Sequence, residues 1–335
     1  MCTNVKMRKA ADGTIVVGRA HEYAQVIPTT LAVVPVGFVG TSIVPEGATS
    51  SVGWVSTHGV IGMSNFGNPE WLIDGMNTAG VSIHAQAMAP AYCTYSEPKL
   101  DGTDLSMNEF PCFLLSTCGS VAEMKAAAAG VNVWGIDVGA GFIPPFHFLI
   151  HDADSSAVIE FHDGVMHIVD NPTGVGTNAP YMDWHLTNLN NYLGLQNTAH
   201  PAVEAFGTTF AGFGIGDGLM GVPGDYSSSG RFVRAAAMVA MSDEPADSAE
   251  AELLTLHMMN ALDIPSGIVH RPVAGELETD IAQWITLSNL TALRYSYRTH
   301  GDPTVYTVDF KDVDFTAPAR NLPISWDNGF VKFAV

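Results

Sequence analysis

The chain has 335 residues, a formal net charge of -20 and only 14 Lys plus Arg. A surface this acidic repels nucleic-acid phosphates and anionic membranes, so neither is an expected partner. Apolar residues make up 47% of the chain and charged residues 14%, a composition typical of a folded protein with a large core. We expect a single domain spanning residues 2–335.

The sequence contains no run of about 18 apolar residues, so no membrane-spanning helix is predicted. Lys6, Arg8 and Lys9 also interrupt any apolar stretch that a secretory signal would need at the start. We therefore expect a cytoplasmic protein, or a periplasmic one if a leader was removed from the sequence. Four cysteines are too few for a disulfide framework.

The first predicted element is a β-hairpin. Two alternating segments, CTNVKMRK and TIVVGRA, flank the turn sequence ADGT, and the Asp12-Gly13 pair favours a two-residue loop. Cys2 begins one strand of this hairpin and Arg19 ends the other. An antiparallel pair therefore places Cys2 and Arg19 in the same neighbourhood.

Strands and helices then follow in separate blocks. Residues 22–69 and 71–88 have the composition of strands and loops. SVAEMKAAAAG predicts a helix with a capping box at Ser120 and Glu123 and a stop at Gly130. Residues 146–172 predict a three-stranded meander with turns at 153–156 and 163–164. Helical patterns occupy 231–241 and 248–264, and 304–310 alternate as a last strand.

This order indicates an α+β layered domain and not a parallel βαβ array. The glycine-rich segment 210–226 lacks a preceding strand with a following helix at the spacing of a dinucleotide-binding motif. We interpret it as a loop.

Cys2 would carry unusual chemistry if Met1 were removed. The freed α-amine, with a reference pKa near 8, could act as a base close to neutral pH, so one residue would hold both a thiol nucleophile and its general base. Arg19 could stabilise the thiolate, and Glu22 could accept hydrogen bonds from the amine. The alternatives are a cysteine placed by chance and a surface ion pair between Arg19 and Glu22.

Four blocks in order extend this interpretation: Cys2-Thr3, DGTIVVGR with an acid three residues after the arginine, TNAPYMDWHLTNLNNY, and PGDYSSSGRFVRAA. Together they resemble the choloylglycine hydrolase family of N-terminal nucleophile hydrolases, which contains bile salt hydrolases and penicillin V acylases. The resemblance covers residue 2 to beyond 235. It implies a four-layer αββα sandwich of two antiparallel sheets between helices, and hydrolysis of a linear amide through an acyl-enzyme with no metal and no cofactor.

The resemblance also assigns catalytic roles. It implies that Cys2 is the nucleophile, that Arg19 stabilises its thiolate, and that Glu22, where most members have aspartate, holds the α-amine. Asn178 matches the asparagine of the oxyanion hole, the group of donors that stabilises the negative oxygen of the intermediate. Arg231 matches the arginine near that developing charge.

The substrate-binding residues complete the prediction. Many bile salt hydrolases have an asparagine where this chain has Ala87, so the main-chain N–H near Ala87 is the expected second oxyanion donor. We expect an apolar acyl pocket around His21, Tyr23, Phe66 and Trp134.

Other chemistries are less well supported by the sequence. His147 and His151 share a strand face, but they lack the carboxylate pattern of a zinc helix, and no GxSxG elbow of a serine hydrolase occurs. Candidate substrates are small-molecule amides: conjugated bile salts, penicillin V, N-acyl homoserine lactones or N-acylethanolamines. A non-catalytic protein that binds amphiphiles on the same scaffold is a further alternative. A homo-oligomer is expected, with a tetramer favoured and residues 95–110 as a possible contact segment.

Overall fold

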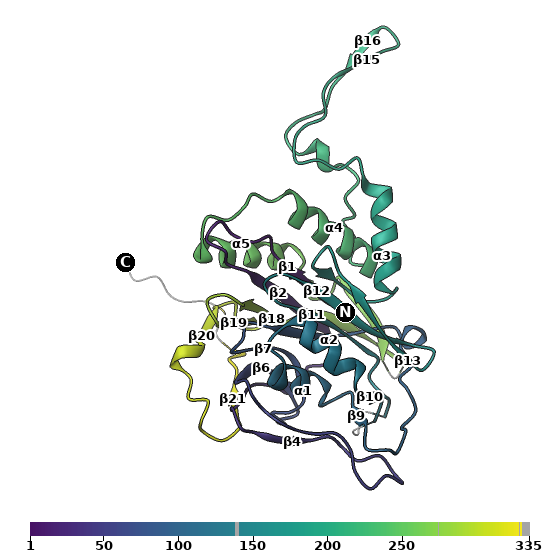
Figure 1. Ribbon diagram of the computed structural model, residues 1–335. Coiled ribbons are helices and arrows are strands. Elements are labelled where there is room, and N and C mark those ends of the chain that lie inside the picture. The colour runs from purple at the N-terminus through teal and green to yellow at the C-terminus, as the bar shows by residue number, and fades with distance from the viewer. Residues whose placement is uncertain (138–140, 274, 328, 330–335) are drawn as a thin grey trace.

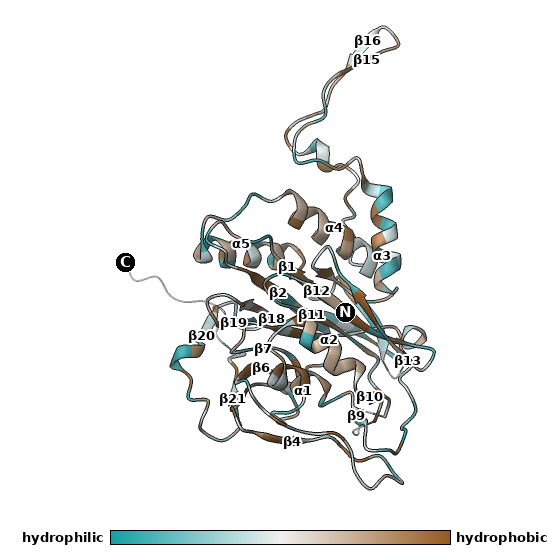
Figure 2. Ribbon diagram, in the orientation of Figure 1, coloured by the Kyte–Doolittle hydropathy of each residue, from teal (hydrophilic) through white to brown (hydrophobic). Residues whose placement is uncertain are grey.

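The structure is a computed structural model that describes residues 1–137, 141–273, 275–327 and 329. Two antiparallel sheets lie face to face, with helices on the outer side of each (Figure 1). The strands of both sheets mix apolar and polar residues, as Figure 2 shows. Central strands such as β2 (Val16–Tyr23), β6 (Val60–Asn65) and β7 (Leu72–Asn77) are buried on both faces. The predicted αββα sandwich is confirmed.

The first sheet carries the N-terminus. Its order is β14-β1-β2-β18-β19-β20, and β17 pairs with β18. Antiparallel pairing places β1 between β2 and β14, and β18 on the other side of β2. The strands are β1 (Cys2–Lys6), β2 (Val16–Tyr23), β14 (Val175–Gly176), β17 (Val269–Val273), β18 (Glu276–Asn289), β19 (Arg294–Thr299) and β20 (Tyr306–Asp309).

The second sheet has the order β13-β12-β11-β8-β7-β6-β3-β21. Its strands are β3 (Thr29–Val34), β6 (Val60–Asn65), β7 (Leu72–Asn77), β8 (Ser82–Ala87), β11 (Phe146–His151), β12 (Ser156–His162), β13 (Val165–Asp170) and β21 (Arg320–Pro323). Three small ladders lie outside the sandwich: β4 (Val39–Thr41) with β5 (Gly53–Val55), β9 (Asp104–Ser106) with β10 (Asn132–Trp134), and β15 (Val203–Ala205) with β16 (Thr208–Phe210).

Helices seal the outer faces of the sandwich. α4 (Ser228–Met241) and α5 (Ser248–Ala261) pack on the first sheet, where Phe232 and Met259 share a core with Val5, Val16 and Ile285. α1 (Phe110–Thr117) and α2 (Val121–Ala129) pack on the second sheet. α3 (Met182–Asn188) precedes a long excursion of the chain. Within the described ranges, no helix combines the length and apolarity needed to cross a bilayer.

Most local predictions are confirmed. In α2 the Ser120 Oγ accepts from the Glu123 N–H at 3.1 Å, and the Glu123 carboxylate accepts from the Gly119 N–H at 2.7 Å, so the cap forms as expected. The meander is β11, β12 and β13. The two-residue hairpin loop is wrong: Ala10 N–H bonds to Thr14 O at 2.9 Å, which encloses three residues.

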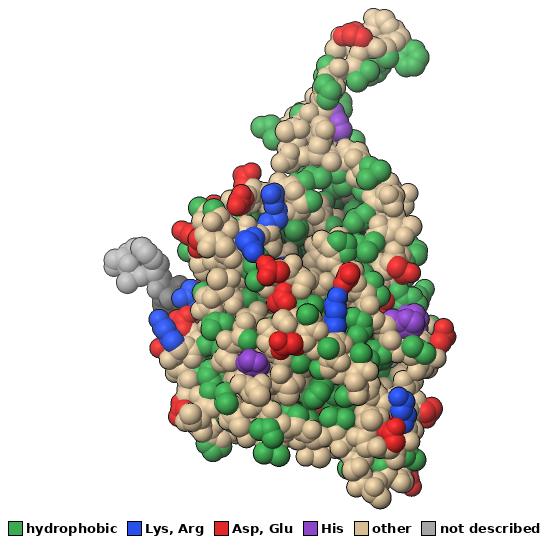
Figure 3. Space-filling model, in the orientation of Figure 1, with side chains coloured by type: hydrophobic (Ala, Val, Ile, Leu, Met, Phe, Trp, Pro, Cys, Tyr) green, Lys and Arg blue, Asp and Glu red, His purple; other side chains and the backbone are tan. Residues whose placement is uncertain are grey.

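Residues 193–225, which we call the arm, leave the sandwich and end in the β15–β16 hairpin far from both sheets (Figure 1). The loop predicted at 210–226 therefore forms part of a projecting segment. Figure 3 shows hydrophobic side chains gathered along the arm. The exposed apolar residues of the arm are Leu193, Val203, Phe206, Phe210, Phe213, Ile215, Leu219 and Met220.

Candidate active site

Cys2 begins β1 and lies in the buried centre of the sandwich, with only 2% of its surface exposed. Residues opposite each other in the β1–β2 ladder are Cys2 with His21 and Asn4 with Arg19. Side chains two positions apart share a face of a strand, so Arg19 and His21 both project toward the thiol. The predicted proximity of Cys2 and Arg19 is confirmed. Met1 is still attached, so the Cys2 main-chain N–H stands in for the free α-amine.

The guanidinium of Arg19 contacts the thiol directly. Arg19 Nη2 lies 3.6 Å from Cys2 Sγ, also donates to the Ala85 carbonyl, and the guanidinium sits 4.8 Å from the ring centre of Trp284. Burial alone would raise the pKa of the Cys2 thiol, but Arg19, the N-terminal ammonium and main-chain hydrogen bonds outweigh it and lower the pKa. The geometry suits a stabilised thiolate.

Asp74, which the sequence analysis did not single out, forms an ion pair with Arg19 through Nη1, while Arg19 Nη2 faces the thiol. Its carboxylate lies 3.8 Å from Arg19 Nη1 and accepts from His84 Nδ1 at 2.5 Å and Thr286 Oγ1 at 3.0 Å, as well as from the Tyr295 hydroxyl. Burial raises the pKa of Asp74, but these donors hold it below its usual value. A charged carboxylate fixed this way restrains the guanidinium. The only sequence signal is an acid within an apolar strand.

Asn178 and Arg231 come from distant parts of the chain to the start of β1. Asn178 Oδ1 accepts from the Cys2 N–H at 3.0 Å and from Arg231 Nη2 at 2.5 Å. Arg231 Nη1 donates to the Cys2 carbonyl at 2.5 Å and to Thr3 Oγ1 at 2.6 Å. Asn178 Nδ2 donates to the Ala87 carbonyl at 2.6 Å. The structure therefore brings Asn178, Arg231 and Ala87 together around Cys2.

Ala87 ends β8 and also faces the sulfur. Its main-chain N–H is one of the hydrogen-bond donors that lower the pKa of the Cys2 thiol. A main-chain N–H that points at the nucleophile can also stabilise the negative oxygen that forms beside the sulfur during attack.

Glu22 is buried, with 1% of its surface exposed. Neither carboxyl oxygen has a hydrogen-bond partner within the described part of the chain. Burial raises the pKa of this carboxyl to about 8, although the charge of Arg231 opposes the shift. While Met1 is attached, its ammonium donates at 2.6 Å to the Glu22 main-chain carbonyl and not to the carboxyl.

The four predicted pocket residues occupy different environments. His21 Nδ1 lies 4.0 Å from Cys2 Sγ. Tyr23 lies under the guanidinium of Arg271, 4.7 Å from the ring centre. Phe66 is exposed in the turn after β6, and Trp134 is buried at the end of β10. Among the described residues, no hydrogen bond or ring contact joins Phe66 or Trp134 to Cys2, so their place in the pocket stays a prediction.

The strand histidines are held by core hydrogen bonds. His147 Nε2 lies 2.9 Å from the Thr177 carbonyl, and His151 bonds to Asn4 Oδ1 at 2.7 Å and Ser156 Oγ at 2.8 Å. In the ranges that the structure describes, no three or more His, Cys, Asp or Glu side chains cluster as a metal site would require. His151 links β11 to β12 and to β1 of the first sheet, and His147 links β11 to the residue after β14.

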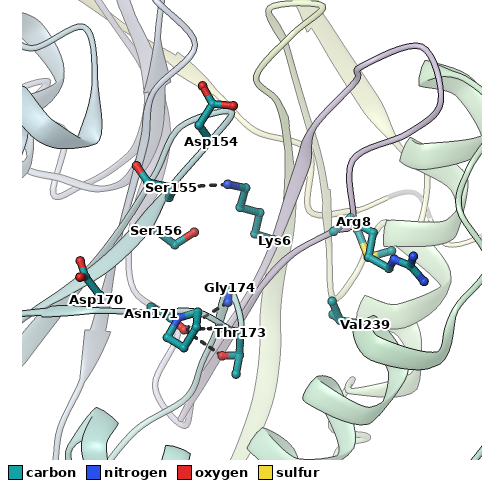
Figure 4. Close-up of a pocket in the computed structure, with 12 residues that line it drawn as sticks. Lys6, Arg8, Asp154, Ser155, Ser156, Asp170, Asn171, Thr173, Gly174 and Val239 are labelled. Carbon is teal, nitrogen blue, oxygen red and sulfur yellow. Dashed lines mark hydrogen bonds between the residues drawn. The ribbon is translucent and has the colours of Figure 1, made fainter.

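A cavity of about 470 Å³ lies at the Lys6 end of β1, opposite the end that carries Cys2 (Figure 4). Lys6 crosses this cavity, and its Nζ donates to the Ser155 carbonyl at 3.2 Å. Asp154 and Ser156 lie on the same wall, and Arg8 points away from them. Cys2 and Lys6 are at opposite ends of the strand, so this cavity is separate from the thiol.

Comparison with known proteins agrees with this geometry. The sequence model of the linear amide C–N hydrolases, choloylglycine hydrolase family, matches residues 2–322. The chain belongs to this family. It is an amide hydrolase with an N-terminal Cys2, as the four sequence blocks implied.

Individual relatives are similar over nearly the whole chain. The bile salt hydrolase/transferase of Clostridium perfringens is 29% identical over 320 residues and 92% of each chain. The crystal structure of a mutant conjugated bile acid hydrolase from the same organism superposes with a TM-score of 0.86 at 24% identity and covers 100% of both chains. Penicillin V acylase from Agrobacterium tumefaciens gives a TM-score of 0.73 at 21% identity, covering 94% of this chain and 88% of that chain. The two structural matches establish the shared fold.

Proposed function

We propose that this chain, after removal of Met1, hydrolyses N-acyl amides by attack of the Cys2 thiolate on the amide carbonyl. The observation that carries the proposal is the convergence of Arg19, Asn178 and Arg231 on the start of β1, each within hydrogen-bonding range of Cys2. Attack forms a bond from sulfur to carbon and places a negative charge on the carbonyl oxygen. The α-amine takes the thiol proton and, as an ammonium, gives it to the leaving amine while the C–N bond breaks. Water then adds to the thioester, the S–C bond breaks, and the acyl group leaves as a carboxylic acid while the sulfur regains its proton.

The oxyanion is stabilised by Asn178 Nδ2 and the Ala87 main-chain N–H. Asn178 Nδ2 now donates to the neutral Ala87 carbonyl, and an oxyanion is a stronger acceptor than a carbonyl. The donor therefore exchanges its partner as charge develops. Removal of one such donor raises the barrier by about 3 kcal/mol in comparable sites.

Arg231 and Glu22 shape the electrostatics of the α-amine. Arg231 holds the Cys2 carbonyl and Asn178 Oδ1, so it fixes the nucleophilic residue and its oxygen partner together. The Glu22 carboxylate is proposed to hold the freed α-ammonium of Cys2. The adjacent positive charge in turn favours the ionised form of the carboxylate. Removal of Met1 is thus expected to lower the pKa of Glu22 from its raised value of about 8.

The substrate is an amide of a small amine and an apolar acyl group. We propose conjugated bile salts and penicillin V as the first candidates, because similar proteins are named for these substrates; N-acyl homoserine lactones and N-acylethanolamines are alternatives. His21, Tyr23, Phe66 and Trp134 are proposed to line the acyl pocket.

The test begins with intact mass, which shows whether the chain starts at Cys2. Turnover is then measured with glycine and taurine conjugates of bile acids, penicillin V, an acyl homoserine lactone and an N-acylethanolamine. Release of the amine from at least one amide supports the proposal. A chain that starts at Cys2 but cleaves none of them contradicts it. A retained Met1 and a thiol that resists alkylation would favour a non-catalytic protein that binds amphiphiles.

We further propose a cytoplasmic homo-oligomer, with a tetramer favoured. The arm supports oligomer formation because the surfaces of its residues Phe213 and Ile215 are fully exposed. Exposed apolar side chains gathered on one segment mark a contact surface. A second copy of the chain is the partner that the symmetric assembly of such enzymes suggests.

A further inference from the structure

His21 carries a polar atom that the catalytic scheme above does not use. It lies directly opposite Cys2 in the β1–β2 ladder, with 7% of its surface exposed. Its ring stacks on Trp284, with the ring centres 4.6 Å apart and 10° between the planes. The stack and the strand register together fix the direction in which both ring nitrogens point.

The contact with Arg19 determines the protonation of the ring. Arg19 Nη2 lies 3.3 Å from His21 Nδ1, and a guanidinium can only donate hydrogen bonds. Nδ1 is therefore the acceptor, and the neutral ring carries its proton on Nε2. Burial, followed by the charge of Arg19, lowers the pKa of His21 well below its usual value, which keeps the ring neutral. His21 is thus an N–H donor through Nε2, and its Nδ1 faces Arg19 Nη2, whose two hydrogens are shared among Nδ1, the Ala85 carbonyl and Cys2 Sγ.

The Nε2–H of His21 has no hydrogen-bond partner among the described residues and is shielded from solvent. A buried donor without a partner is destabilising, and buried polar groups are normally satisfied. Nε2 lies across the imidazole ring from Nδ1, and Nδ1 is 4.0 Å from Cys2 Sγ. The donor is therefore close enough to Cys2 for the acyl chain of an amide bound there to reach it.

We propose that the His21 Nε2–H donates a hydrogen bond to an oxygen of the substrate's acyl chain, so that the enzyme selects acyl groups with an ether, keto or hydroxyl oxygen near the amide carbonyl. The inference rests on the proposed attack by Cys2. A phenoxyacetyl group has such an oxygen one carbon beyond the carbonyl. A 3-phenylpropionyl group has the same length and the same ring, with a methylene in place of the oxygen.

The experiment measures kcat/KM for phenoxyacetylglycine and 3-phenylpropionylglycine. We expect the wild-type enzyme to favour the phenoxyacetyl amide by about tenfold or more, because the methylene leaves the donor unpaired. In His21→Phe, which keeps an aromatic ring against Trp284 but has no donor, the ratio is expected to fall to near 1. His21→Gln keeps an N–H donor and is expected to retain part of the preference. His58→Phe, in the turn between β5 and β6 of the structure, is the matched control and leaves the ratio unchanged.

Two results would overturn the inference. The first is a wild-type ratio near 1 or a ratio that His21→Phe leaves intact. The second is an equal loss of turnover for both amides together with a shifted pH profile, which would assign His21 to proton transfer. Binding of both amides to Cys2→Ala and to Cys2→Ala/His21→Phe, measured by calorimetry, gives a readout without chemistry. If neither amide is cleaved by the wild type, the proposed function fails for them, and the ratio of the two dissociation constants still decides the role of His21.

Discussion

The active site and the arm distribute polar and apolar groups in opposite ways. At the site, Arg19, Glu22 and Arg231 are almost fully buried. In the arm, Phe206, Phe213 and Ile215 are almost fully exposed. Buried charges oppose folding, whereas exposed apolar side chains gain nothing from folding and stay in unfavourable contact with water until another surface covers them.

The two regions also differ in how the cost is offset. Arg19 and Arg231 find partners inside the chain: Asp74 lies 3.8 Å from one, and Asn178 Oδ1 lies 2.5 Å from the other. The arm projects away from both sheets (Figure 1), so its exposed apolar residues are free to contact a second copy of the chain, as proposed above. This comparison predicts that changes at the site affect chemistry and that changes in the arm affect assembly.

The largest effect is expected at the nucleophile. Cys2→Ala removes the attacking atom, and we expect kcat/KM to fall on the order of 10⁴-fold or more. Cys93→Ser, which alters a half-buried thiol elsewhere in the chain, is the control and keeps turnover. Turnover of the best amide and circular dichroism of both variants check the prediction. A Cys2→Ala enzyme with wild-type turnover would refute the assignment of the nucleophile.

A smaller loss is expected from Asn178→Asp. The substitution keeps the shape and the oxygen that faces Arg231, but it replaces the Nδ2 donor with a negative oxygen near the oxyanion. We expect kcat to fall by about 10²–10³-fold with little change in fold. Asn191→Asp, after α3 on an exposed segment, is the matched control. A kcat within a factor of two of the wild type would exclude Asn178 from the oxyanion hole.

The half of the site nearest the N-terminus could be predicted from the sequence alone. The ADGT turn sets the spacing of the hairpin, and the spacing brings Cys2 to Arg19 even though the loop has one residue more than expected. Asn178 and Arg231 are different, since 176 and 229 residues separate them from Cys2. Local patterns do not encode such separations, and only the resemblance to a family identified these two residues.

The parts that were missed share a physical cause. β18 pairs with β2 and is the longest strand, yet its buried residues do not alternate with exposed ones, because a central strand of a sandwich is covered on both faces. α1 lacks a side-chain cap and begins at Phe110-Pro111, so an apolar run without helix signals conceals it. Asp74 appears as a single acid in a strand. Its function becomes clear only when β8, β18 and β19 supply His84, Thr286 and Tyr295.

Glu22 gives a pH test of the buried charges in protein that retains Met1. Its pKa is raised to about 8 in the folded state, against about 4.5 when unfolded. Between these values the folded chain holds a proton that the unfolded chain has lost. The free energy of unfolding therefore falls as pH rises through this window, by roughly 1 kcal/mol per pH unit. Chemical denaturation at pH 5 and pH 8 should show that Glu22→Gln removes this decline.

The exposed Glu46→Gln is the control for Glu22, and its pH dependence should follow the wild type. An unchanged pH dependence in Glu22→Gln would mean that Glu22 is already ionised in the folded chain. In that case the carboxylate would be available to hold the ammonium without any change in its pKa.

The smallest effect on turnover is expected in the arm. In the double variant Phe213→Ser/Ile215→Ser, two fully exposed apolar side chains of the arm become polar, so an assembly that buries them loses contact area. Light scattering should show a lower molecular mass, while kcat/KM per chain stays within about twofold because neither residue contacts Cys2 among the described residues. Val39→Ser removes an exposed apolar residue in β4 and should leave the mass unchanged.

If the double variant keeps the wild-type mass, the arm is not the contact, and residues 95–110 become the next segment to alter. If turnover falls with the mass, the arm of one copy completes the site of another, and the division between chemistry and assembly does not hold.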